Sequence, residues 1–312
     1  MSLNELELIG RLTPSLATNA SVVTGAGDDC AVLDLGLPGK VLLFKTDAVV
    51  EGVHFTAETP PEKIGHKALA RCFSDIAAMG GTPSSVLITL GLPDGFDAAR
   101  VEQIYAGMNA LARRYDVAIA GGETTRNPGQ LLLSVAAIGT VPKDGCIRRA
   151  GAKPGDAIFV TGELGGSLAG KHLDFEPRVA EANWLREHFP PHAMIDLSDG
   201  LAGDLRHLLH AGGVGAELLA RAIPVSRAAK LAARDHPDAK PALLAALTDG
   251  EDFELLFTTA SQQAVRLLDA WKARFPDVRL SCIGKVQTGT EVVLRDATGC
   301  RPFPQHGYVH FT

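Results

Sequence analysis

Acidic side chains recur in this sequence at places where predicted strands and helices end. The loops are Gly27-Asp28-Asp29, Thr46-Asp47, Ser74-Asp75, Gly122-Glu123-Thr124, Asp196-Leu197-Ser198-Asp199-Gly200 and Asp249-Gly250-Glu251-Asp252. An aspartate beside a glycine is ordinary turn chemistry, so each loop taken alone could be structural. Six such loops in one chain favour a shared role, because carboxylates that converge need a cation to offset their repulsion.

The chemistry expected of such a cluster is the binding of a hard divalent cation. No His or Cys residues have the spacing of a zinc site, and oxygen ligands suit Mg²⁺, which commonly bridges protein carboxylates and substrate phosphates. The sequence has no Walker A loop, no protein-kinase motif set and no Gly-x-Gly-x-x-Gly that opens a helix after a strand. If the chain handles a nucleotide, we expect metals rather than a glycine-rich loop to hold the phosphates.

Residues 44–55 form the stretch around which the other loops are arranged. The apolar residues 41–44 predict a buried strand that ends as the chain becomes polar, which would place Thr46, Asp47 and His54 near the strand end. Oxygen ligands there could hold a cation, with Asp47 as the central ligand. Asp47 could equally begin a turn, with His54 an ordinary half-buried histidine.

Strands and helices alternate in both halves of the chain, which predicts a mixed α/β fold. In the first half the patterns predict helices over residues 2–12, 60–80 and 97–114 and strands over 41–44, 85–90, 117–120 and 131–141, with Ser2 and Glu5 in capping-box spacing. In the second half they predict helices over 165–171, 176–188, 201–211, 226–234 and 261–274 and strands over 157–160, 194–197, 215–219, 253–258, 280–286 and 291–294.

Length and composition indicate a two-domain globular protein. The chain has 312 residues, of which 46% are hydrophobic, enough for two cores. A turn-rich stretch at residues 142–145 predicts the boundary, with an N-terminal metal- and nucleotide-binding domain over 1–141 and a C-terminal domain over 142–312.

Charge and cysteine usage restrict the class of partner and the compartment. A net charge of −6 predicts no basic surface for nucleic acid or an anionic membrane, and no apolar run approaches the roughly 20 residues needed to span a bilayer. The 5 cysteines contain no Cys-x-x-Cys pair, which argues against a disulfide framework and favours a reducing compartment. We therefore expect a cytoplasmic protein.

A series of motifs spans nearly the whole chain. They are Gly27-Asp28-Asp29-Cys30-Ala31-Val32-Leu33, Thr46-Asp47 with His54-Phe55, Lys67-Ala68-Leu69-Ala70 with Ser74-Asp75-Ile76-Ala77-Ala78-Met79-Gly80, Gly121-Gly122-Glu123-Thr124-Thr125-Arg126, Gly151-Ala152-Lys153-Pro154-Gly155-Asp156, Ile195-Asp196-Leu197-Ser198-Asp199-Gly200 and Gly250-Glu251-Asp252. In order and spacing these motifs resemble those of bacterial thiamine-monophosphate kinases. The resemblance implies two α/β domains of the aminoimidazole ribonucleotide synthetase-like type and a homodimer formed through the N-terminal sheet. It also implies phosphorylation of thiamine monophosphate by ATP with several Mg²⁺ ions.

The resemblance further implies which residues form the site. The implied magnesium ligands are Asp29, Thr46, Asp47, Asp75, Glu123, Asp196 and Asp199. The implied ATP contacts are Tyr105, Gly122, Glu123, Arg149 and Ser198. The implied contacts to thiamine monophosphate are His54, Glu251 and Gln305. We assign no catalytic nucleophile or base, because a phosphate monoester is already largely dianionic at neutral pH.

Three residues depart from the family pattern. Lys45 stands where the family usually has a small hydroxyl residue that helps to hold a metal, so we expect one magnesium site to be lost or replaced by a fixed ammonium. Glu123 stands where the family commonly has Asp. Gln305 aligns with a Trp that stacks on the substrate.

Two other interpretations stay open at this point. One is another ATP-dependent synthetase or maturation enzyme of the same superfamily, and the other is a non-catalytic paralogue that binds nucleotide or metal. Residues 1–20 contain no Cys and the last residue is Thr312, which disfavours relatives that need a reactive Cys in those segments.

Overall fold

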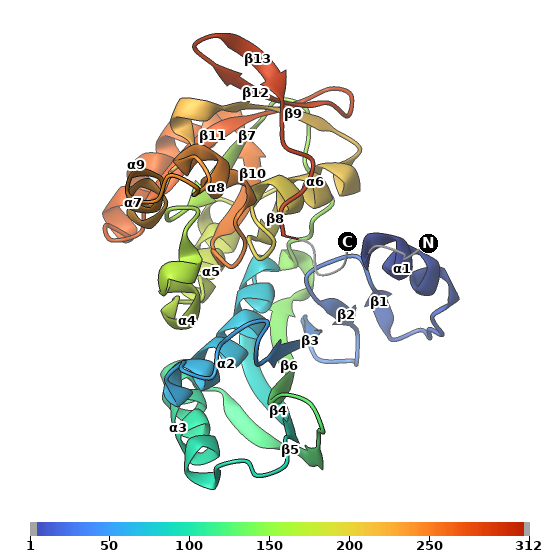
Figure 1. The fold of residues 1–312 in the computed structure, drawn as a ribbon. Helices are drawn as coiled ribbons and strands as arrows, with labels where there is room; N and C mark the ends of the chain where they lie inside the picture. The colour runs from blue at the N-terminus through green and yellow to red at the C-terminus, as the bar shows by residue number, and fades with distance from the viewer. Residues whose placement is uncertain (1–4, 309–312) are drawn as a thin grey trace.

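Two β-sheets, one in each half of the chain, organise the molecule. The computed structural model describes residues 5–308, apart from the side chain of Leu6, and within them contains a six-stranded and a seven-stranded sheet. Figure 1 shows the sheets in two lobes, with α1 (Glu5–Leu12) beside the edge of the first sheet that β1 (Val22–Thr24) and β2 (Ala31–Leu33) form. The predicted mixed α/β fold is confirmed, whereas the predicted capping residue Ser2 lies outside the described residues.

The first sheet has the strand order β1-β2-β3-β6-β4-β5. Its strands are β1 (Val22–Thr24), β2 (Ala31–Leu33), β3 (Lys40–Val50), β4 (Thr82–Leu92), β5 (Ala118–Arg126) and β6 (Leu132–Pro142). Helices α2 (Pro61–Ala78) and α3 (Ala98–Arg114) pack on one face. On the opposite face Phe44 and Leu87 are 46% and 51% exposed, so that face presents apolar side chains that no helix within residues 5–308 covers.

β3 is longer than predicted, and its length changes where its polar residues lie. The strand runs through Lys40–Val50 and pairs with β6 along that whole length, so the expectation that it ends near residue 44 is wrong. Side chains alternate between the faces of a strand. Lys45 and Asp47 point toward α2, whereas Phe44 and Thr46 point to the uncovered face. Backbone pairing continued past the polar residues because ladder hydrogen bonds do not depend on side-chain polarity.

The second sheet has the order β13-β12-β9-β11-β7-β10-β8. Its strands are β7 (Asp156–Thr161), β8 (Ala193–Asp196), β9 (Gly215–Leu219), β10 (Leu255–Ala260), β11 (Leu280–Gln287), β12 (Val292–Asp296) and β13 (Gly299–Pro302). The helices around it are α4 (Lys171–Asp174), α5 (Val179–His188), α6 (Leu201–Gly212), α7 (Arg227–Asp235), α8 (Ala242–Thr248) and α9 (Ala264–Arg274). The predicted division at residues 141 and 142 falls at the end of β6 and stays a prediction.

Several predicted elements differ in extent from the observed ones. β5 continues to Arg126, so Gly122 and Glu123 belong to an edge strand and not to a loop. β10 begins at Leu255, because Phe253 has a φ of 49°, which is incompatible with an extended strand. The sequence patterns also missed α8 and β13, and predicted a helix over residues 165–171 where a 3₁₀ turn precedes α4.

A continuous hydrophobic core joins the two lobes. It extends from the first sheet through α2 to α5, α9 and one face of the second sheet, where Phe159 and Trp271 are buried. A second core, which includes Ile158 and Leu205, lies on the other face of that sheet. The shared core holds α2 against β8, and this junction is where the site lies.

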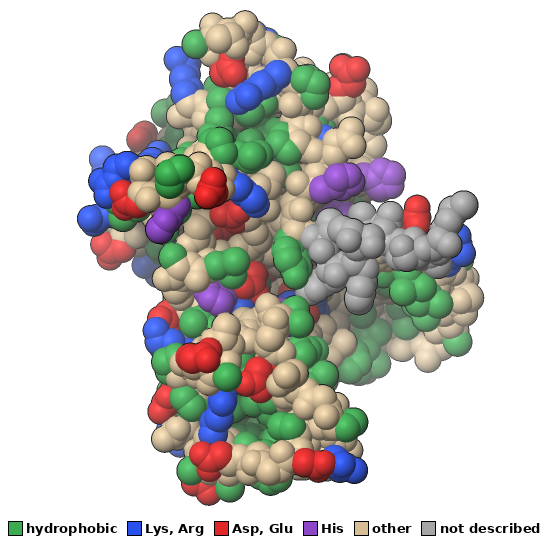
Figure 2. Space-filling model, viewed as in Figure 1, with side chains coloured by type: hydrophobic (Ala, Val, Ile, Leu, Met, Phe, Trp, Pro, Cys, Tyr) green, Lys and Arg blue, Asp and Glu red, His purple; other side chains and the backbone are tan. Residues whose placement is uncertain are grey.

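Figure 2 shows acidic and basic side chains interspersed over both lobes on the visible face. Among residues 5–308 no helix combines the length and the hydropathy that crossing a membrane requires.

Candidate functional site

Three carboxylates from three separate elements converge at the junction of the two sheets. Asp29 precedes β2, Asp75 lies in the last turn of α2, and Asp196 is the last residue of β8. All three are buried, and one oxygen of each lies within 4.8 Å of the others. The structure thus brings together three of the seven predicted magnesium ligands, contributed by both lobes.

Each of these carboxylates accepts hydrogen bonds on one oxygen. Arg149 Nη2 donates to Asp29 Oδ1 at 2.6 Å, Lys45 Nζ donates to Asp75 Oδ1 at 2.8 Å, and Ser74 Oγ donates to Asp196 Oδ2 at 2.6 Å. Burial nevertheless raises the pKa of Asp75 well above its ordinary value and raises the pKa of Asp196 to about 6. The charges of Lys45 and Arg149 thus do not fully offset the cost of burying these carboxylates.

The donor set fits a magnesium ion. Asp29 Oδ2 is buried and has no hydrogen-bond partner among the described residues, although buried carboxylate oxygens are normally satisfied. The converging atoms are all carboxylate oxygens, the ligands that Mg²⁺ prefers. A divalent cation here would satisfy the orphaned oxygen and supply the missing charge.

Asp47, predicted as the central ligand, lies beside this cluster rather than in it. Its Oδ1 is 3.6 Å from Lys45 Nζ and 3.9 Å from Arg71 Nη2. The Lys45 ammonium thus stands between Asp47 and Asp75. Burial alone would lower the pKa of Lys45, but the carboxylates of Asp75 and Asp47 outweigh it and hold that pKa well above its ordinary value.

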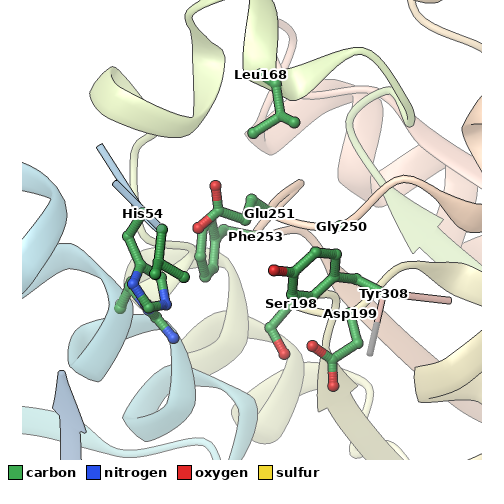
Figure 3. A pocket seen from close by; sticks show the side chains of 10 residues that line it. His54, Leu168, Ser198, Asp199, Gly250, Glu251, Phe253 and Tyr308 are labelled. Atoms are coloured by element: carbon green, nitrogen blue, oxygen red, sulfur yellow. The ribbon is translucent and has the colours of Figure 1, made fainter. Parts of the chain in front are cut away.

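A pocket opens next to the carboxylates. It is lined by Val53, His54, Arg71, Leu168, Ser198, Asp199, Gly250, Glu251, Phe253 and Tyr308. Figure 3 shows the His54 and Tyr308 rings on opposite sides, with Glu251 and Phe253 between them. Four residues predicted for substrate, nucleotide or metal therefore share one cavity, and Ser198 and Asp199 connect it to Asp196 through the chain.

Beneath the pocket floor lies a fully buried lysine that the sequence analysis did not assign to the site. Lys67 Nζ contacts the His54 carbonyl oxygen at 2.6 Å, Glu251 Oε1 at 2.7 Å and His172 Nδ1 at 2.8 Å. Burial lowers the pKa of Lys67 to about 8 although Glu251 opposes the shift. Burial alone would raise the pKa of Glu251, but His172 and Lys67 together hold it at about 2, so Glu251 stays ionised. The sequence feature that could have identified Lys67 was its position in the family motif Lys67-Ala68-Leu69-Ala70.

Tyr308 lines the pocket together with the rings of Phe253 and His54, whereas the predicted substrate contact Gln305 does not. Gln305 is exposed and is not among the lining residues. Tyr308 lines the pocket, and its backbone N–H donates to the Asp199 carbonyl oxygen at 2.8 Å. Gly307 permits this approach, since a Cβ there would lie 2.0 Å from the same oxygen. The pair Gly307-Tyr308 was the sequence feature that could have identified this aromatic contact.

The other predicted residues are not brought to this junction. Thr46 and Glu123 are exposed on the first sheet, and neither belongs to the carboxylate cluster. Gly122 lies on the edge strand β5, where a Cβ would lie 1.8 Å from the Ile88 carbonyl oxygen, so close strand contact requires this glycine. Tyr105 is half-buried on α3 and packs against the core.

Comparison with known families identifies the first lobe. Residues 27–141 match the family model described as AIR synthase related protein, N-terminal domain. This range contains β2 to β6, α2 and α3, and with them Asp29 and Asp75.

Two curated relatives that match more than nine-tenths of the chain carry the same name. The thiamine-monophosphate kinase of Rhodopirellula baltica is 41% identical over 93% of this chain and 92% of its own. The thiamine-monophosphate kinase of Bacillus subtilis is 34% identical over 99% of this chain and 100% of its own. The solved structure of AaThiL complexed with AMPPCP and TMP has a TM-score of 0.80 and 31% identity, and the match covers 100% of this chain and 99% of that one.

Proposed function

The chain belongs to the thiamine-monophosphate kinase family, and we infer that it transfers the γ-phosphoryl group of ATP to thiamine monophosphate, giving thiamine diphosphate and ADP. Asp29, Asp75 and Asp196 converge beside the pocket, and this observation is our reason for assigning the function to these residues. Both features lie at the junction of the two lobes, where donor and acceptor phosphates can be brought together.

Phosphoryl transfer to thiamine monophosphate requires the negative charges of the two phosphate compounds to be offset more than it requires proton transfer. The acceptor is a phosphate monoester with a second pKa of about 6, so it is already a dianion at neutral pH and needs no general base. The obstacle is repulsion between two polyanions. Magnesium, when bound, supplies the positive charge that offsets this repulsion.

The residues of the chain orient the reactants around that charge. Asp29, Asp75 and Asp196 would hold the cation, and Arg149, paired with Asp29, is placed to bind a phosphate when that pairing loosens. Ser198 and Asp199 lie between this cluster and the pocket and would orient the nucleotide. Arg71, which lines the pocket and approaches Asp47, adds a second guanidinium on the acceptor side.

The pocket suits the organic part of thiamine monophosphate. The thiazolium ring of thiamine is cationic, so the ionised Glu251 and the aromatic face of Tyr308 are complementary to it. His54, across the cavity from Tyr308, is placed to contact the phosphate. Tyr308 would thus take the stacking role of the family Trp with which Gln305 aligns.

The remaining predicted residues are explained by a homodimer. Thr46, Gly122 and Glu123 lie on the exposed side and edge of the first sheet, and we propose that a second copy covers this surface and completes the ATP and metal contacts there. A small-molecule kinase with cysteines that are all free also suits the cytoplasm, which we retain as a proposal.

The direct test is incubation of the protein with ATP, Mg²⁺ and thiamine monophosphate, followed by chromatography. We expect thiamine diphosphate and ADP in equal amounts. The Asp47→Asn variant should fold but lose turnover, whereas Asp34→Asn, which removes a carboxylate from a surface ion pair with Lys143, should retain it. ADP formed only with a different acceptor, or ATP bound without turnover, would overturn the proposal.

A further inference from the structure

Lys45 is a cation built into the acidic site. It lies on the face of β3 that points toward α2, two residues before Asp47 on the same face of the strand. Its Nζ is 2.8 Å from Asp75 Oδ1 and 3.6 Å from Asp47 Oδ1, and its side chain is only 21% exposed. One ammonium therefore serves two carboxylates that come from a strand and a helix.

The Lys45–Asp75 ion pair differs from a simple structural ion pair in its surroundings. Asp75 also belongs to the group of three buried carboxylates whose oxygens lie within 4.8 Å of one another. Within that group Lys45 is paired with Asp75, and Arg149 is paired with Asp29 at 2.6 Å. Asp29 Oδ2 is buried and has no hydrogen-bond partner among the described residues. Lys45 and Arg149 thus offset part of the negative charge of the buried carboxylates. The remaining negative charge can attract an added cation.

We propose that the Lys45 ammonium takes the place of a divalent cation between Asp47 and Asp75, so that this chain binds one divalent ion fewer than it would with a hydroxyl residue at position 45. The inference deepens the proposed function and rests on it only in taking the carboxylate cluster as a metal site. A tethered ammonium cannot dissociate, so part of the site's charge compensation is independent of the free metal concentration.

The proposal also accounts for the length of the side chain at position 45. From β3, only a long side chain can reach a point within hydrogen-bond distance of a carboxylate on α2. A serine or threonine there would leave a gap between Asp47 and Asp75, and two carboxylates facing a gap attract a cation. Removal of Lys45 should therefore create a site as well as remove a charge.

The experiment counts Mn²⁺ ions bound by the full chain, by the loss of the free-ion electron paramagnetic resonance signal, without nucleotide or substrate. We expect Lys45→Thr to bind one more Mn²⁺ per chain than the unsubstituted protein, and Lys45→Arg, which keeps the charge, to bind the same number. Lys143→Thr is the matched control, because it removes a lysine from an exposed ion pair with Asp34 and should not change the count.

An equal count for Lys45→Thr and the unsubstituted protein would overturn the proposal. If Lys45→Thr does not fold without metal, Lys45→Gln keeps a hydrogen-bond donor on a side chain one bond shorter than lysine but removes the charge. Its melting temperature should then rise more with added Mn²⁺ than that of the unsubstituted protein, and an equal rise would be contrary evidence. Because the count needs no turnover, it is independent of the kinase assay: a changed count without thiamine diphosphate refutes the proposed function alone.

Discussion

Lys67 shows how much of the site depends on groups that never reach its surface. Its ammonium joins the His54 backbone and the Glu251 side chain, which come from different lobes. Glu251 itself has a φ of 63°, a conformation that costs an L-residue free energy. A buried ammonium that bonds the strained residue and the His54 loop together is a physical reason for both to keep their places.

Replacement of Lys67 by methionine tests this role. Lys67→Met should lower the free energy of unfolding by about 3 kcal/mol, because it leaves the buried Glu251 carboxylate without its ammonium. The KM for thiamine monophosphate should rise about tenfold or more, while the KM for ATP changes less. Chemical denaturation and steady-state kinetics measure the two effects.

Lys63→Met is the control on the same helix. Lys63 pairs with Asp174 at 2.6 Å, but both side chains are exposed, so the cost should stay within about 0.5 kcal/mol. Equal effects of the two substitutions would contradict a special role for Lys67.

The pKa of Lys67 gives a pH dependence with a definite sign. Burial lowers that pKa to about 8, so the ammonium is lost as the pH rises through that value. Glu251, whose pKa is about 2, stays charged and loses its partner. The KM for thiamine monophosphate should therefore increase above about pH 8, and the inflection should be absent in Lys67→Met. A KM that falls over the same range, measured by steady-state kinetics from pH 6.5 to 9.5, would refute the assignment.

At the scale of elements, α2 is the helix that positions the site. Lys67, Arg71, Ser74 and Asp75 follow one another at helical spacing, so their side chains form one polar stripe along a helix that is otherwise buried. Within the stripe Lys67 bonds to Glu251 of the pocket, Arg71 lines the pocket, and Asp75 belongs to the carboxylate cluster. A shift of α2 would therefore disturb both at once.

The close contact of α2 with α3 keeps this helix in place. A Cβ at Gly65 would lie 2.0 Å from the Ile104 carbonyl oxygen, and a Cβ at Gly107 would lie 1.9 Å from the Glu62 carbonyl oxygen. Gly65→Ala should therefore force the helices apart, lower the free energy of unfolding by about 3 kcal/mol and reduce turnover.

Gly10→Ala in α1 provides the comparison for this substitution. No heavy atom lies within 4 Å of a Cβ at Gly10, so alanine there should leave stability unchanged or raise it by up to about 1 kcal/mol. Thermal and urea unfolding of both variants measure the difference. A harmless Gly65→Ala would show that the helices are not locked by backbone contact.

For the whole molecule, the uncovered face of the first sheet is a surface that the site described above does not explain. Phe44 and Leu87 are exposed there, and the edge strand β5 beside it is exposed along most of its length. Edge strands and apolar sheet faces of this kind are usually covered in the functional state. The proposed homodimer would cover both.

Light scattering during size-exclusion chromatography tests the dimer. The unsubstituted chain should elute with twice the mass of one chain, and Leu87→Asp should elute as a monomer, because a charge would be buried in an apolar interface. Val265→Asp, at a hydrophobic residue 73% exposed on α9, should remain dimeric. A monomeric unsubstituted protein at micromolar concentration would refute the dimer.

The sequence alone determined the properties that depend on neighbouring residues. Alternating patterns predicted the mixed α/β fold, and the motifs predicted the family, because helix spacing, turn glycines and local motifs are written in consecutive residues. Boundaries were less certain where local signals conflict with tertiary pairing. β3 continued through polar residues because β6 paired with it, and this partner lies about ninety residues further along the chain.

Only the tertiary structure decided which of the acidic residues meet. Ser74 and Asp196 are 122 residues apart, yet they are hydrogen-bonded, and nothing in either loop specifies the other. The same holds for Lys45, whose place between Asp47 and Asp75 depends on β3 facing α2, and for Tyr308 in the pocket in place of Gln305. Distances between remote side chains are fixed by the packing of whole elements around a common core, which no local pattern encodes.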